Sequence, residues 1–217
     1  MGLTVSVGVY TDDLDADVRE QYLTDFRLIN RILKAAGLSA HKEKPSAEDL
    51  RWNVGMGYSR LHFLRRFAAS VAVTGRVPTP LRRNATATTS PEIRAYCSRV
   101  VRPSSRLFDH LMCHSDAEGY YVPIDFPSVL NADQAVPLTG GYLGSSVRLR
   151  DECRMLADHL ELPDADFDLD DDGEWKRLKI ATHGAVWHRY PIEAFACAAL
   201  RSACTRSIEL KAAIVFG

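Results

Sequence analysis

The stretch "LMCHSDAEGYYVPIDFP", residues 111–127, joins a helix-like segment to a strand-like one and so decides how the middle of the chain is organised. Apolar residues at helical spacing predict a helix that ends at about His114. Gly119 favours a left-handed turn after it, and "YYVPIDF" predicts a strand over 120–126. Because Pro123 has no amide donor, we expect this strand to lie at a sheet edge or to end nearby.

The elements on either side are read from their hydrophobic periodicity. A Val-rich alternating segment predicts a first strand, and an apolar run after Lys211 predicts a last strand that pairs with the first. Apolar residues three and four apart predict helices between them. The strands are expected at 3–10, 120–126 and 212–216, and the helices at about 18–36, 59–73, 91–101, 105–114 and 146–160, with two more before the last strand. This pattern predicts an α+β fold that is predominantly helical, with a small sheet of about three short strands.

The length of 217 residues and the apolar content of 46% predict a single globular domain over residues 1–217. Residues 75–91 combine Pro, Thr, Asn and Arg without periodicity, which predicts a surface loop or lid. Residues 163–174 hold a run of aspartates and are expected to form an acidic connection between helices. In the helix over 59–73, Arg65 and Arg66 are expected to face away from the core.

Composition excludes several classes of protein. Lys and Arg number 27 and Asp and Glu 28, so no overall charge attracts nucleic acid or an anionic membrane. No secretory signal opens the chain, and no window approaches the roughly 20 apolar residues of a membrane span. The five cysteines contain no Cys-x-x-Cys pair, which argues against a disulfide framework or a closed zinc site and favours reduced thiols. We therefore expect a cytoplasmic protein with neither a nucleic-acid nor a membrane partner.

The turn after the 105–114 helix carries the first candidate site. On a helix His114 lies about 90° from the centre of the apolar face, and Asp116 follows in the turn. A histidine held by a carboxylate in a partly buried cleft can act as general acid or base, with Tyr121 as hydrogen-bond donor, so these three are the predicted catalytic residues. A helix C-terminus with an Asx-turn explains the same residues without function.

His110 and His114, four residues apart, also have the spacing of a metal-binding pair. No third ligand is fixed by spacing, so no metal is assigned and the cofactor stays unknown.

The second candidate is "TGGYLGSSVRLR", residues 139–150. Glycines let backbone amides turn inward, and a helix that begins after them presents further unpaired amides to an anion. An ordinary capped loop explains the segment equally well, and neither a Walker nor a dinucleotide motif is present. The predicted anion-binding residues are Gly140, Gly141, Gly144, Ser145, Ser146 and Arg148.

The segments "HSDAEGYYVPIDF", "GGYLGSS" and "SIELKAAIVFG" resemble those of an uncharacterised family of bacterial proteins over nearly the whole chain. This resemblance implies a cytosolic bacterial setting and a complete small protein. It implies no activity, cofactor or site.

Two classes of function remain. In the first, the protein binds a small polar or anionic ligand, as an enzyme that uses the His114–Asp116 pair or as a metal-dependent hydrolase that uses His110 and His114. In the second, it is a non-catalytic protein-binding module of the immunity, antitoxin-like or regulatory kind. The first class predicts that 111–127 and 139–150 meet in one concave pocket, and the second predicts an exposed flat patch.

Overall fold

The structure is a computed structural model that describes residues 2–81, 85–99, 107–132, 136–163 and 184–217. These residues form an α+β fold with one six-stranded mixed sheet in the order β2-β1-β6-β3-β5-β4. Only β3 and β5 run parallel, and the other neighbours are antiparallel. The strands are β1 (Gly2–Val7), β2 (Trp52–Gly57), β3 (Gly119–Val122), β4 (Leu130–Asn131), β5 (Tyr142–Ser145) and β6 (Ile214–Phe216).

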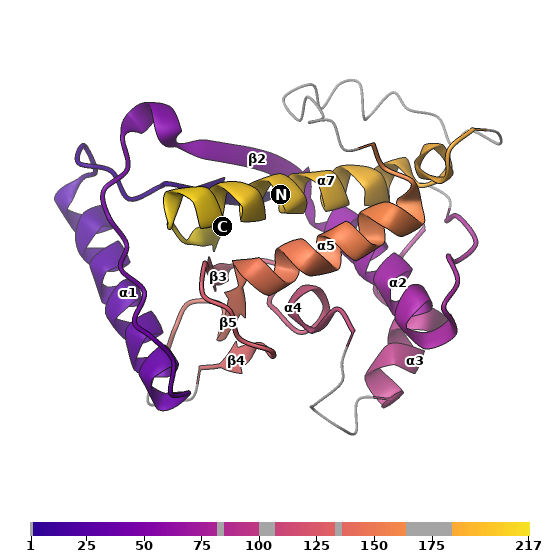
Figure 1. Cartoon of the computed structure of the whole chain (residues 1–217), viewed down its shortest axis with the longest axis horizontal. Helices are drawn as coiled ribbons and strands as arrows, with labels where there is room; N and C mark the ends of the chain where they lie inside the picture. Colours follow the sequence, from indigo (N-terminus) through magenta and orange to yellow (C-terminus); the bar gives the residue numbers. More distant parts are fainter. Residues whose placement is uncertain (1, 82–84, 100–106, 133–135, 164–183) are drawn as a thin grey trace.

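Helices cover the two faces of the sheet unequally (Figure 1). The larger core lies between one face and α2, α4, α5 and α7, where side chains from β1, β2, β3 and β6 meet the helices. Strand alternation sends every second residue of β1 into this core, as at Leu3, Val5 and Val7. The described helices are α1 (Ala16–Ala35), α2 (Tyr58–Thr74), α3 (Pro91–Arg99), α4 (Asp109–Met112), α5 (Ser146–Leu160) and α7 (Pro191–Leu210).

Among the described helices, α1 covers the second face. Phe26, Ile29 and Leu33 of this helix pack on Tyr120 and Leu143 of the sheet. The hydroxyl of Tyr120 donates to the buried carboxylate of Asp25 at 2.6 Å, which ties α1 to the middle strand. Helix α1 therefore lies at one end of the molecule, with its other side directed to solvent (Figure 1).

The predicted sheet of about three strands is wrong in size, because β2, β4 and β5 were missed. In β2 the residues Trp52, Val54 and Met56 alternate with Asn53, Gly55 and Gly57. The apolar residues recur with a period of two, but the glycines between them have a low strand propensity, so the segment does not read as a strand. Strands β4 and β5 have two and four residues, which is too short for periodicity to reveal them.

The strand β3 is internal, between β6 and β5, and ends at Val122. It stops one residue before Pro123, as the missing amide of proline requires. The last strand pairs antiparallel with the first, as predicted. The predicted helix at 105–114 is shortened to α4, and its start lies outside the described residues, as does nearly all of the acidic connection at 163–174.

The described parts of the 75–91 segment are held to the helices beside them. Arg66 donates to the carbonyl of Thr79 at 3.0 Å, and the hydroxyl of Tyr190 donates to the carbonyl of Pro78. Arg66 also forms a 2.6 Å ion pair with Glu92 of α3. Its exposure is only 4%, so the prediction that Arg66 faces away from the core is wrong.

The contact between β3 and β5 leads to a stability prediction. A Cβ at Gly144 would lie 2.1 Å from a ring carbon of Tyr121. We expect Gly144→Ala to lower the free energy of unfolding by about 2 kcal/mol or more, because neither the strand nor the buried ring has room to move. Urea unfolding measures this change. Gly55→Ala in β2 is the matched control, because a Cβ there meets nothing within 4 Å; an equal loss in both variants would contradict the prediction.

Candidate functional site

A buried carboxylate holds the beginning of α4. Glu152 of α5 accepts the backbone N–H groups of His110 and Leu111 at 2.9 and 2.8 Å. These amides belong to the first turn of the helix and have no partner within it. In its ionised form the Glu152 side chain also interacts favourably with the helix dipole. Burial raises the pKa of Glu152 to about 8, although the two amide hydrogen bonds act in the opposite direction.

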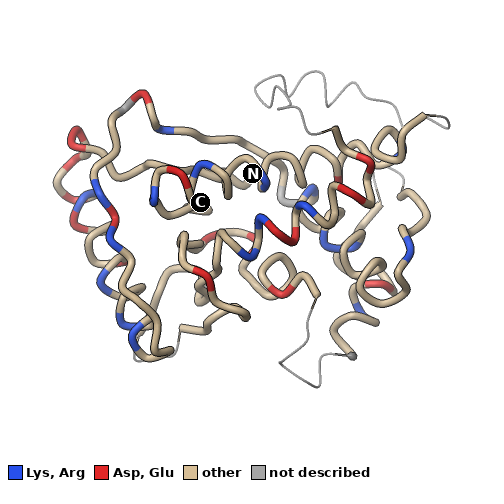
Figure 2. Tube along the Cα trace, viewed as in Figure 1, with Lys and Arg blue, Asp and Glu red and all other residues tan. Residues whose placement is uncertain are grey.

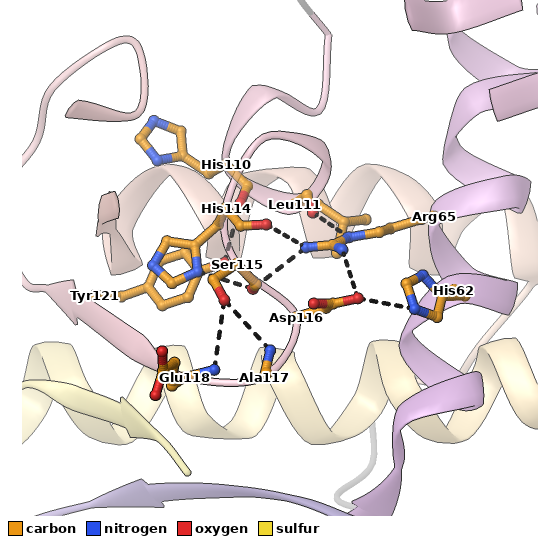
Figure 3. A network of polar contacts seen from close by, with 10 residues as sticks. All are labelled: His62, Arg65, His110, Leu111, His114, Ser115, Asp116, Ala117, Glu118 and Tyr121. Carbon is orange, nitrogen blue, oxygen red and sulfur yellow. Dashed lines mark hydrogen bonds and ion pairs between the residues drawn. The ribbon is translucent and has the colours of Figure 1, made fainter. Parts of the chain in front are cut away.

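A buried guanidinium holds the end of the same helix (Figure 3). Arg65 of α2 donates to the carbonyls of Leu111, His114 and Ser115 at 2.8, 2.6 and 3.4 Å. Carbonyls at the C-terminal end of a helix have no hydrogen-bond partner within the helix. The prediction that Arg65 faces away from the core is therefore wrong. The apolar character of the 61–73 segment on all sides was the available signal, because an arginine in such a helix must be buried and paired.

His110 joins α4 to β5. Its Nδ1 accepts the backbone N–H of Ser145 at 3.0 Å, so the ring is neutral and Nε2 donates to the carbonyl of Phe126 at 3.1 Å. Burial lowers the pKa of His110 to about 4, which agrees with the neutral ring. The side chain therefore fixes the spacing between the helix and the strand, and both of its nitrogens are engaged with backbone.

His114 is enclosed in the same way. Its ring stacks on Tyr121 with centroids 4.0 Å apart and meets Phe216 edge-on. Its two nitrogens lie 3.0 Å from the carbonyls of Ser115 and Tyr120. Burial lowers the pKa of His114 to about 4, although the hydrogen bonds to these two carbonyls act in the opposite direction. Tyr121 donates its hydroxyl to the carbonyl of His110 at 3.0 Å, and burial raises its pKa well above the ordinary value.

Asp116 pairs with a different histidine from the one predicted. Its carboxylate lies 2.8 Å from Nε2 of His62 and 3.9 Å from Arg65, both on α2 (Figure 3). The side chain of Ser115 accepts the amides of Ala117 and Glu118 and so shapes the turn. Nothing in the sequence spacing indicated His62, which is far away along the chain and reaches the turn only through helix packing.

The Gly-rich loop is engaged with the protein itself. Ser145 caps α5 by accepting the amide of Arg148 at 3.2 Å, and its hydroxyl donates to the carbonyl of Ile124 at 2.6 Å. Ser146 bonds to Ser207 of α7 at 2.9 Å, and Arg148 forms a 2.5 Å ion pair with Asp125.

The glycines of this loop allow close backbone contact. Gly140 and Gly141 adopt φ values of 79° and 72°, and a Cβ on Gly140 would lie 2.3 Å from the carbonyl oxygen of Glu118. The structure thus brings the two predicted segments, 111–127 and 139–150, together. It packs them against each other, and His110 and Ser145 are buried at this contact, whereas the ion pair between Arg148 and Asp125 is exposed.

No group of three or more His, Cys, Asp or Glu side chains that could hold a metal ion occurs in the described ranges. His110 and His114 direct their nitrogens at different backbone groups. Of the described helices, none combines the length and apolar character needed to cross a bilayer.

The fold is α+β. Within it, the side chains predicted to form a site make hydrogen bonds or ion pairs with other groups of the same chain. A family model described as "Putative DNA-mimic protein" matches residues 1–216, and the chain belongs to that family. Searches of curated proteins and of solved structures found no match.

The family contradicts the prediction of a small polar or anionic ligand, with or without catalysis. A protein that imitates DNA acts on proteins that bind DNA, so its partner is a macromolecule. The predicted partner, a small molecule, is wrong for the same reason. The family supports the alternative, a non-catalytic protein-binding module.

Glu152 makes the stability of the fold depend on pH. Its folded-state pKa of about 8 exceeds the ordinary value of 4.5, so between these values the folded state keeps a proton that the unfolded state releases. Stability therefore falls as pH rises through this window, by roughly 5 kcal/mol at most. We expect Glu152→Gln to remove this slope. The measurement is urea unfolding of both proteins at several values between pH 5 and 8; parallel stability curves for the two proteins would contradict the assignment.

Arg65 leads to a second prediction on the same network. Arg65→Met keeps an apolar stem of similar length but leaves buried carbonyls at the end of α4 without donors. We expect the free energy of unfolding to fall by about 3 kcal/mol or more. Arg154→Met is the control, because that side chain is 59% exposed on α5 and its loss should change stability by less than about 0.5 kcal/mol. A similarly small change in the free energy of unfolding of Arg65→Met would show that the hydrogen bonds of Arg65 are not needed for stability.

Proposed function

We propose that this protein binds to a DNA-binding protein. The contact involves the surface with which that partner binds DNA. The observation that carries the proposal is the family match over residues 1–216. The contacts of the predicted site residues support it: His114 and Ser145 bond to backbone groups, Asp116 pairs with His62, and Arg148 pairs with Asp125. Binding through the protein surface is then the activity for which the fold is suited.

The charge of the chain limits how this imitation works. Duplex DNA carries one negative charge per about 1.7 Å of helix axis. The whole chain has a net charge of −1, so the carboxylates must be concentrated locally to resemble DNA. Such a concentration occurs at the beginning of α1, where nearly every second residue is acidic. We call this the acidic N-terminal surface; it comprises Asp12, Asp13, Asp15, Asp17 and Glu20, all exposed.

Two cations lie beside these carboxylates and reduce their combined charge. Arg19 donates to the backbone carbonyl of Asp12 at 2.5 Å and lies 3.9 Å from its carboxylate. Arg51 and a hydrogen bond from Thr11 lower the pKa of Asp13, with the hydrogen bond the larger cause. The carboxylates of this surface stay exposed, as at Asp12, whose side chain is 86% exposed. The sequence has a second acidic run, seven acids within residues 164–174, which lies outside the described residues.

The acidic N-terminal surface is tested by removing its charge. We expect proteins captured from a bacterial lysate by the immobilised wild type to be released by added duplex DNA, because both ligands occupy one surface. Asp12→Asn, Asp13→Asn and Asp15→Asn combined should reduce capture at least about tenfold, since interactions with a polyanion-binding surface depend on several charges at once. Mass spectrometry identifies the released proteins.

The matched control removes three exposed acids elsewhere, by Asp151→Asn, Asp158→Asn and Glu209→Gln. It should retain capture, because it changes the net charge equally but leaves the acidic N-terminal surface intact. Capture that duplex DNA does not disturb would contradict the proposed function. Equal loss in both triple variants would show that net charge, and not this surface, governs binding.

A further inference from the structure

The outward face of α1 carries a stripe of six exposed polar residues. They recur at intervals of three, four, three, four and three, which keeps them within about 100° of arc on a helix with 100° per residue. This spacing is that of the contact line between two packed helices. The residues are Asp17, Glu20, Thr24, Arg27, Arg31 and Lys34, and each of them is exposed.

Charge along this stripe is divided between the two ends of the helix. The acids lie in the first turns and the cations in the later ones, so one end is negative and the other positive (Figure 2). Between residues 26 and 47 the only carboxylate is Glu43, and it is buried. Glu43 accepts the backbone N–H of Ala213 at 2.8 Å and pairs with His41 at 2.5 Å.

The extended segment that follows α1, residues 38–45, adds further cations to the basic end of the helix. The side chain of Asn30 bonds to the backbone N–H and carbonyl of His41 at 2.7 and 2.9 Å, which holds this segment against the helix. Because neighbouring side chains of an extended chain point in opposite directions, the inward Glu43 leaves Lys42 and Lys44 outward. Both lysines are exposed. This end of the described structure therefore presents five cations, and one of them, Arg27, is paired with Glu20 at 3.0 Å.

This charge pattern is complementary to itself. A two-fold axis that crosses α1 between residues 25 and 26 places the helix antiparallel to a copy of itself. In that register Asp17 faces Lys34 of the second copy, Glu20 faces Arg31, and Thr24 faces Arg27. Each contact occurs twice, as a two-fold interface requires.

We propose that two copies of this chain associate through antiparallel pairing of their α1 helices. The position of α1 at one end of the molecule leaves its outward face accessible (Figure 1). The 3.0 Å ion pair between Glu20 and Arg27 is compatible with this register, because Arg27 faces the uncharged Thr24 across the interface. Exposed ion pairs are individually weak, so the dimer is weak and sensitive to salt.

The dimer goes beyond the proposed function and does not depend on it. Pairing engages Asp17 and Glu20 but leaves Asp12, Asp13 and Asp15 outside the contact. Loss of partner capture with an intact dimer, or the reverse, therefore separates the two proposals.

Charge reversal tests the pairing, with sedimentation equilibrium as the measurement. Glu20→Arg alone, or Arg31→Glu alone, changes two attractive contacts into two repulsive ones because of the two-fold axis. We expect each to raise the dimer dissociation constant at least about tenfold. The double variant Glu20→Arg with Arg31→Glu restores both contacts and should return the constant to within about threefold of the wild type. Asp158→Arg on α5 is the control and should leave it unchanged.

Salt dependence gives an independent readout. The wild-type dimer should form at about 0.1 M salt, where the Debye length is about 10 Å, and dissociate at about 1 M, where it is about 3 Å. Circular dichroism shows that each variant is folded. Failure of the double variant to recover association overturns the proposal.

A monomeric wild type at low salt also overturns the proposal. Binding of a fluorescent duplex DNA to that monomer, lost in Arg31→Glu, would assign the basic end to nucleic acid instead.

Discussion

Arg65 and Glu152 hold opposite ends of one short helix, and much of the molecule depends on this pair. The guanidinium takes up the carbonyls at the end of α4, and the carboxylate takes up the amides at its beginning. A helix of four residues has almost no internal hydrogen bonds, so its polar groups need partners from elsewhere. Those partners come from α2 and α5, so α4 depends on contacts with both helices.

The position of α4 in turn fixes the middle of the sheet. The ring of His110 accepts the backbone N–H of Ser145, where β5 ends and α5 begins. Tyr121 of β3 donates its hydroxyl to the carbonyl of His110. His114 fills the space beside Tyr121. Polar side chains are dense here because the chain turns sharply within the core, where every amide and carbonyl needs a partner. The same density of His, Tyr, Ser and Asp looks catalytic when only the sequence is read.

What the sequence revealed depended on local periodicity. The helix α5 was predicted with its observed bounds, Ser146–Leu160, because its apolar residues follow one face and Ser145 supplies the cap. The strand β2 was missed because glycines occupy two of its six positions. Arg65 was placed on the wrong side of α2 because a charged residue is usually exposed, and its carbonyl partners are almost fifty residues away. The pairing of Asp116 with His62 is likewise a product of helix packing, which spacing along the chain does not reveal.

The near-zero net charge does not conflict with membership of a DNA-mimic family, because charge here is separated along α1. This helix has 20 residues and is about 30 Å long. The Debye length at physiological ionic strength is about 8 Å, so charges at the two ends of the helix are largely screened from each other. A partner at the acidic end meets the carboxylates of Asp12 to Glu20 and scarcely senses Arg31 or Lys34. Since interaction depends on the charge within a Debye length of the contact, the sum over the chain says little about what each surface attracts.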